Sequence, residues 1–270
     1  MTNKIKQFNF WFNIFILVGM VTAVTVVSLM QLKTPEARLL MQVIAGLGAI
    51  MGVINTVLSA NANVWTFLFG FIDVICCSIV YFDSGIMGTC ALHVFYFLPM
   101  QFIGFWQWTK RGAETKSHVN EEGEREIRKV RVRRLSGKQW GLVVAAFIVG
   151  TAVAYSILYF IDLGQLRAGH ISEISQSKIF LDAAVLILNI IGQILLSFAF
   201  ADQWFIWNFV NIFSILLWTN RLLSPDANGY TIVMAIKYVF YLMNSINGLR
   251  IWLALAKEHS APEETGHGCC

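Results

Sequence analysis

Long apolar stretches recur from one end of the chain to the other and are separated by short polar segments. A helix that crosses the hydrocarbon core of a bilayer needs about 20 apolar residues, and each stretch approaches that length. We therefore predict eight membrane-spanning helices, and the fold class is an all-α polytopic membrane protein. The predicted spans cover residues 8–31, 39–59, 63–82, 86–108, 139–161, 178–200, 203–221 and 230–256.

Composition supports this class. The chain has 270 residues, of which 57% are hydrophobic and only 13% are charged. The first apolar stretch starts too near Met1 and is too long for the apolar region of a signal peptide, so we interpret it as a helix. The five cysteines have neither the spacing of a zinc site nor that of a secreted disulfide framework. We expect no metal and no cofactor.

One loop sets the predicted orientation. Residues 109–138 hold ten Lys or Arg and five Glu residues with almost nothing apolar, so we expect this loop to stay unburied and to lie in the cytoplasm. With eight spans, a cytoplasmic loop at this place puts both termini in the cytoplasm. The positive charge is concentrated in this loop, so it reports topology and gives no indication of nucleic-acid binding.

The chain also contains an internal repeat, with a first copy at 39–108 and a second at 178–256. Three helices reverse the chain's direction across a membrane, so the one extra span at 139–161 makes the two copies parallel. Residues 1–38 then form an extra N-terminal helix, and residues 257–270 form a flexible tail. The coinciding pairs are Asn55 with Gln193, Phe69 with Trp207, Gly70 with Asn208, Asp73 with Asn211, Gly104 with Gly248, and Trp108 with Trp252.

The most informative stretch runs from Asp202 to Asn220. It is apolar enough to span a bilayer, yet three indoles and two carboxamides fall on one helical face. An unpaired amide in hydrocarbon costs several kcal/mol by order of magnitude, so this face should look into protein or a cavity. A flat molecule that forms hydrogen bonds would suit it. The residues of this face are Trp204, Trp207, Asn208, Asn211 and Trp218.

These motifs resemble a known family. The aromatic second helices VWTFLFGFIDV and QWFIWNFVNIF, the endings GFWQW and GLRIW, and the 3+1+3 layout resemble the PnuC family of vitamin B3 transporters, which is similar in architecture to the SWEET sugar carriers. The resemblance covers about residues 39–256. It implies uptake of nicotinamide riboside by facilitated diffusion across the bacterial inner membrane, trapping by a cytoplasmic kinase and, frequently, a homotrimer.

We expect the two copies to enclose one pathway, with the second helix of each copy in its lining. Asp73 would favour a cationic pyridinium ring, although a structural hydrogen bond to another helix is the alternative reading for this and the other polar positions. Lys237 lies close enough to the outer end to snorkel, and His93 and Gln101 occupy the matching helix of the first copy. The candidate substrate-binding residues are Trp204, Trp207, Asn208, Asn211, Asp73, Gln193, Tyr241 and Asn244.

Other functions remain as alternatives. Tryptophans also stack on sugar rings, so a sugar carrier is the runner-up. A retinal-type light receptor is suggested by Lys237 in the last span, but the position four residues before it is Val233 and not an acid. We find no phosphate-binding glycine loop, no HExxH and no GxSxG, and therefore no sign of an enzyme.

Overall fold

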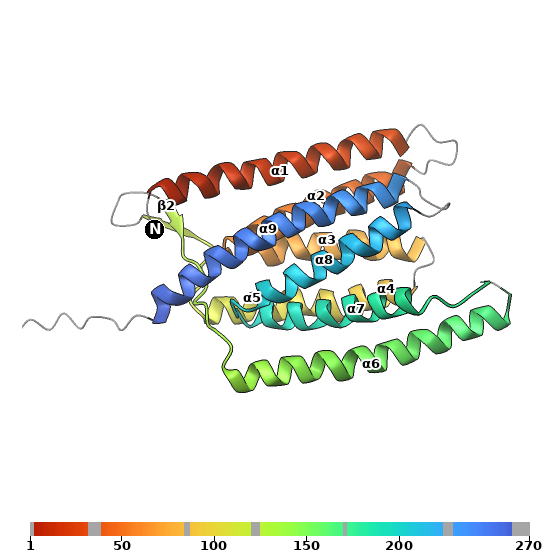
Figure 1. Cartoon of the computed structure of the whole chain (residues 1–270). Coiled ribbons are helices and arrows are strands. Elements are labelled where there is room, and N and C mark those ends of the chain that lie inside the picture. The colour runs from red at the N-terminus through yellow and green to blue at the C-terminus, as the bar shows by residue number, and fades with distance from the viewer. Residues whose placement is uncertain are drawn as a thin grey trace, which may run out of the picture.

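The computed structural model describes residues 3–31, 39–83, 87–119, 125–169, 172–223 and 229–260. Helices run side by side through almost all of this part, and the chain reverses at each end of the bundle (Figure 1). The predicted fold class, an all-α polytopic membrane protein, is confirmed. The helices are α1 (Asn3–Gln31), α2 (Leu39–Ala60), α3 (Thr66–Asp83), α4 (Met87–Leu92), α5 (Leu98–Lys110), α6 (Gly137–Arg167), α7 (Gln176–Ser197), α8 (Gln203–Leu222) and α9 (Gly229–Ser260).

Five stretches of the described helices are long and apolar enough to cross a membrane. The apolar part of α3, Thr66–Val80, is shorter. The five stretches are Gln7–Val27, Val43–Ala60, Gly137–Arg167, Gln176–Ser197 and Ala235–Glu258. We call α2, α3 and α4–α5 the first triplet, and α7, α8 and α9 the second triplet.

The third helix of the first triplet contains a π-helical turn, η1 (His93–Phe97), between α4 and α5. Its defining bond runs from the Leu98 N–H to the His93 carbonyl, five residues back. Pro99 follows directly and has no N–H to donate, so the ordinary four-residue ladder is interrupted at this place. The sequence therefore widens the helix where it lines the central cavity described below.

The first helices of the two triplets, α2 and α7, end in the same way. Ala62 and Ala199 have φ of 56° and 57°, the left-handed conformation that glycine usually supplies after a helix. The Asn63 N–H donates to the Leu58 carbonyl and the Phe200 N–H to the Leu195 carbonyl, which completes a Schellman motif at each helix end. Both alanines are fully buried, so a small side chain is required there even at some cost in backbone strain.

Two tryptophans link the triplets at these helix ends. The indole of Trp108 on α5 donates to the Leu196 carbonyl of α7 over 2.8 Å, and the indole of Trp252 on α9 donates to the Ser59 carbonyl of α2 over 3.0 Å. Each triplet's third helix is thereby tied to the other triplet's first helix. Both donors are buried, and a satisfied buried hydrogen bond contributes on the order of 1 kcal/mol.

These bonds correct the predicted repeat register. Ser59 and Leu196 occupy the same place in the two Schellman motifs, whereas pairing Asn55 with Gln193 would have matched Ser59 with Ser197. The sequence alignment followed polar identities, but backbone capping determines where a helix ends. The structural equivalents are therefore displaced by one residue, with Gly70 matching Trp207.

α1 and α6 lie at opposite edges of the bundle (Figure 1). α6 packs on α7, and α1 packs on α2 and α9. Met20 and Val24 of α1 form a buried cluster with Val53 of α2, against which Tyr241 of α9 packs. The N-terminal helix therefore supports the last helix from outside.

Part of the charged loop is buried, contrary to the prediction. Its strands β1 (Ser117–Val119) and β2 (Arg125–Ile127) form an antiparallel hairpin. Residues 128–135, which we call the strap, then cross the bundle end where α2 and α7 stop. Val130 and Val132 are 0% and 5% exposed and belong to the main core, so the expectation that this loop stays unburied was wrong for the strap.

The strap is held by backbone bonds to both Schellman turns. Val130 donates to the Ala62 carbonyl, while Arg133 donates to the Ala199 carbonyl and accepts from the Ala201 N–H. The Arg133 guanidinium lies 3.9 Å from the centre of the Phe200 ring, and partial burial lowers its pKa. These partners are distant in sequence, so hydropathy alone gave no sign of the contact.

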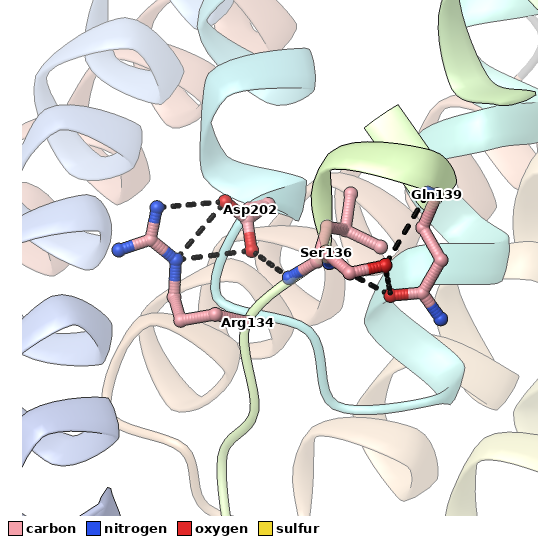
Figure 2. A network of polar contacts seen from close by, with 5 residues as sticks. Arg134, Ser136, Gln139 and Asp202 are labelled. Carbon is pink, nitrogen blue, oxygen red and sulfur yellow. Dashed lines mark hydrogen bonds and ion pairs between the residues drawn. The ribbon is translucent and has the colours of Figure 1, made fainter. Parts of the chain in front are cut away.

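Asp202 fixes the end of the strap to the start of α8 (Figure 2). Its buried carboxylate accepts two bonds from the Arg134 guanidinium, at 2.9 and 3.0 Å, and one from the Leu135 N–H at 2.7 Å. α6 begins immediately afterwards with a capping box between Ser136 and Gln139. One carboxylate thus joins the strap, α8 and the entry to α6.

We expect Asp202→Asn to lower stability by about 2 kcal/mol, because the variant keeps the shape of the side chain but loses its charge-assisted bonds. Arg134 is about half exposed, which keeps the loss below that of a fully buried ion pair. Thermal unfolding in detergent would show a melting temperature several degrees lower. The exposed residue Glu258 provides the control, since Glu258→Gln should leave the melting temperature unchanged. Equal melting temperatures for all three proteins would contradict this role.

Candidate functional site

A cavity of about 650 Å³ lies between the two triplets. That volume falls within the usual range of small-molecule sites, about 300 to 1,000 Å³. Both triplets contribute to it. The polar and aromatic residues of its wall are Asn55, Thr56, Ser59, Asp73, Cys77, His93, Phe97, Gln101, Asp182, Asn189, Gln193, Trp204, Trp207, Asn211, Lys237, Tyr238, Tyr241, Asn244 and Ser245.

Seven of the eight residues proposed from the sequence line this cavity; Asn208 does not. Trp218, on the same predicted helix face, is also absent from the wall. Asn208 instead accepts a hydrogen bond of 2.7 Å from Ser245, which in turn accepts one from Asn211. Asn208 therefore holds a cavity residue in place from behind.

The α8 wall presents two indoles. Trp207 packs on Gly192 of α7, where an added Cβ would lie 3.1 Å from the indole ring. Trp204 packs in the same way on Gly248 of α9, at 2.8 Å. The two glycines let the rings pack closely against neighbouring helices, which restricts the orientation of each indole in the wall.

Three buried polar atoms in the cavity wall have no hydrogen-bond partner among the described residues. They are the Gln193 Nε2 and Trp204 Nε1 donors and the Asn244 Oδ1 acceptor. The Asn244 Nδ2 is paired, because it donates to the Thr56 carbonyl over 2.9 Å. Buried polar groups are normally paired, so unpaired atoms on three residues of one wall favour a polar ligand at this place.

Opposite charges occupy another part of the wall. The Asp73 carboxylate of α3 packs on Gly52 of α2, where a Cβ would lie 2.9 Å from its Oδ2, and Cys77 donates to its Oδ1 over 3.3 Å. Lys237 of α9 lies with its Nζ 5.2 Å from the centre of the Tyr241 ring. Lys237 also lines the cavity, and its snorkelling towards the outer end stays a prediction.

The sequence analysis did not propose several residues of the wall as binding groups. Asn55 is the clearest case, since it was aligned with Gln193 but not carried into the site. It accepts from the Thr66 hydroxyl and lies beside Gly70, where an added Cβ would meet its Nδ2 at 3.2 Å. Its polarity inside an apolar span was the signal that could have identified it.

The cavity ends in aromatic packing on the side of the strap. Phe67 stacks edge-on against Trp108 with ring centres 4.9 Å apart, Trp108 lies 5.4 Å from Trp252, and Trp252 lies 6.2 Å from Trp204. Trp108 and Trp252 are fully buried. The strap covers this cluster through Val130 and Val132, so in this conformation packed side chains fill that end of the pathway.

Comparison with known proteins identifies the family. The sequence pattern of a family described as nicotinamide mononucleotide transporter matches residues 42–254. The chain belongs to this family. Among similar proteins, a nicotinamide riboside transporter PnuC of Neisseria mucosa is 31% identical over 218 residues, covering 80% of this chain and 74% of that protein. A transporter of the same name from Haemophilus influenzae is 27% identical over 225 residues, covering 83% of each.

A solved structure supports the same assignment. The crystal structure of the vitamin B3 transporter PnuC is similar to this chain with a TM-score of 0.64 and 28% identity, and the match covers 91% of this chain and 93% of that one. The predicted resemblance to the PnuC family is confirmed. This PnuC family member is a multi-pass membrane transporter, and its relatives are named as transporters and not as enzymes.

Proposed function

We propose that this transporter carries nicotinamide riboside into the cell by facilitated diffusion. The observation that carries the proposal is the cavity shared by both triplets, whose wall is formed by indoles, amide side chains and a carboxylate. Phosphorylation by a cytoplasmic kinase would trap the substrate after entry. The names of the relatives in Neisseria mucosa and Haemophilus influenzae support the same substrate.

Each part of nicotinamide riboside has a matching group in the wall. Its flat cationic ring suits the faces of Trp204 and Trp207, and its charge suits Asp73. The carboxamide and ribose suit the amide side chains of Gln193 and Asn244, while Asn211 and Tyr241 supply further polar contacts. Each satisfied bond contributes on the order of 1 kcal/mol.

The charges in the wall favour the riboside over the mononucleotide in the family's description. Two carboxylates, Asp73 and Asp182, line the cavity together with one ammonium group, Lys237. A phosphate group carries up to two negative charges and would meet net repulsion in this wall, whereas the riboside's single positive charge is attracted.

We further propose that the strap lies in the cytoplasm. α1 begins and α9 ends at the same end of the bundle as β2, so both termini would be cytoplasmic as well (Figure 1). The described conformation would then be closed towards the cytoplasm by the aromatic cluster. We place the protein in the bacterial inner membrane as a homotrimer, as the family resemblance implies. Exposed apolar side chains along α6, such as Leu142 and Phe160, suit either lipid or another copy.

We expect Trp207→Ala and Asn211→Ala to weaken nicotinamide riboside binding at least about tenfold, or roughly 1.4 kcal/mol each, because they remove a stacking face and an amide from the wall. Isothermal titration calorimetry of the purified variants measures this loss. Trp106→Ala is the matched control, since this indole is 53% exposed on the outside of α5. Near wild-type affinity for both cavity variants would show that α8 packs against the other helices but does not bind the substrate.

Transport should follow the substrate gradient without a coupled ion. In proteoliposomes, labelled nicotinamide riboside should enter until the inside and outside concentrations are equal and then stop. A proton or sodium gradient should leave this plateau unchanged. Accumulation above the outside concentration under either gradient would refute facilitated diffusion.

The orientation is tested with single cysteines at two small, exposed positions, Ser117→Cys in β1 and Ala168→Cys after α6. In intact cells, an impermeant thiol reagent should label the second variant and leave the first unlabelled until the cells are opened. Wild-type protein corrects for the native cysteines. The opposite labelling pattern would overturn the proposed topology.

A further inference from the structure

The two triplets meet along two interfaces, and the strap bridges one of them. α5 packs on α7, and α2 packs on α9. The Trp108 bond lies in the first interface and the Trp252 bond in the second. Arg131 of the strap bonds to the end of α5, while Arg133, two residues later, bonds to the turn after α7. The strap therefore adds a polar link to the α5–α7 interface.

The link to α5 uses both backbone groups of Arg131. Its N–H donates to the Arg111 carbonyl, and its carbonyl accepts from the Arg111 guanidinium, each over 3.0 Å. Two residues of extended chain span at most about 7 Å. The short segment from Arg131 to Arg133 therefore holds the ends of α5 and α7 close together for as long as its bonds persist.

The strap is anchored to the second triplet by charged groups. The Arg133 guanidinium donates to the Phe198 carbonyl over 3.1 Å, and the Asp202 carboxylate accepts from Arg134 and from the Leu135 N–H. Asp202 is fully buried, so separating it from Arg134 would leave an unpaired charge inside the protein. Leu135 also packs against the apolar cluster of α7 and α8. We therefore expect the strap to move together with the second triplet.

The contact of the strap with the turn between α2 and α3 is of a different kind. Val130 is buried there in the apolar core, and its N–H donates to the Ala62 carbonyl over 3.5 Å, longer than the usual distance of about 2.7 to 3.2 Å. Both groups are neutral, so separating them leaves no charge unpaired. This contact can therefore open without disturbing Asp202.

The neighbouring helices fit a movement at this contact. The Arg250 guanidinium of α9 donates to Asn9 of α1 and lies 4.7 Å from the centre of the Phe8 ring, so α1 is tied to α9. Within the first triplet, the Phe67 ring of α3 packs tightly on Gly104 of α5. The turn between α2 and α3 is therefore expected to move together with α5, as part of one rigid triplet.

We propose that the strap and the α5–α7 interface form a hinge, and that the cytoplasmic end of the pathway opens on the opposite side, between α2 and α9. This inference rests on the proposed function and orientation. The first triplet rotates about the hinge, Trp252 separates from Ser59, and Ala62 leaves Val130. The substrate then leaves past Ser59, which lines the cavity. If the triplets parted equally along both interfaces, the charged anchors of the strap would break in every transport cycle.

The experiment locks each contact of the strap separately in the full-length protein. Two cysteines are placed on either side of a contact and joined by a short bismaleimide, and mass spectrometry measures the joined fraction. All six positions are at least partly exposed and lie outside the cavity wall. The pairs are Asn61→Cys with Lys129→Cys at the turn after α2, Arg111→Cys with Arg131→Cys at the end of α5, and Arg133→Cys with Phe198→Cys at the turn after α7.

Uptake of labelled nicotinamide riboside into proteoliposomes is measured before and after joining. The Asn61 lock should lower uptake at least about tenfold, because the turn after α2 can no longer leave the strap. The Arg111 and Arg133 locks should each leave uptake within about twofold, because hinge contacts persist through the cycle. A monofunctional maleimide on the same variants controls for modification without joining, and treated wild type corrects for the native cysteines.

Uptake that survives the Asn61 lock would overturn the hinge. An equal loss of uptake from the Arg111 lock or the Arg133 lock would also overturn it, because the strap would then have to leave that anchor during transport. Asn63→Cys with Arg128→Cys replaces the first pair if that variant does not fold. Failure of the untreated wild type to take up nicotinamide riboside would instead contradict the proposed function itself.

Discussion

The architecture depends on two indole N–H groups that cross between the triplets. Trp108 and Trp252 donate to the next-to-last carbonyls of α7 and α2, at positions that are equivalent in the two Schellman motifs. These bonds fix where the triplets meet. Within each triplet, Gly104 and Gly248 let the third helix approach the second closely, since a Cβ at either would collide with an aromatic ring of that helix. The strap packs on the same surface and seals it. The joint holds the two triplets together at one end of the shared cavity.

The two tryptophan bonds are equivalent in the two triplets, but the cavity walls are not. The two ends of a ligand therefore meet different groups in the cavity. In the structural register, Gly70 is equivalent to Trp207 and Asn55 is equivalent to Gly192. The first triplet therefore packs an amide on a glycine, whereas the second packs an indole on a glycine. Asp73 likewise matches the apolar residue Val210. At these two positions the walls therefore differ in bulk, hydrogen bonding and charge. This asymmetry suits a ligand with a flat cationic ring at one end and a sugar at the other.

The spans and most residues of the wall could be predicted from the sequence. Helices that cross a membrane have a strong apolar pattern, and polar residues inside them are easily recognised. It missed what depends on partners far apart in the chain. The strap has no periodicity of its own, and Val130 is buried in a core cluster whose other members, such as Ala62 and Trp252, are distant in sequence. The rotation of α9 turns Lys237 into the cavity, and packing of α1 on α9 supports that helix. No local pattern in the sequence reports that rotation.

The most direct test of a single pathway shared by two triplets is the stoichiometry and selectivity of binding to the wild-type protein. Titration calorimetry with nicotinamide riboside, followed by glucose and sucrose, measures both at once. The account predicts saturable binding of one nicotinamide riboside per chain and no heat of binding from either sugar. Two equivalent sites per chain, or a sugar that binds in place of the riboside, would contradict it.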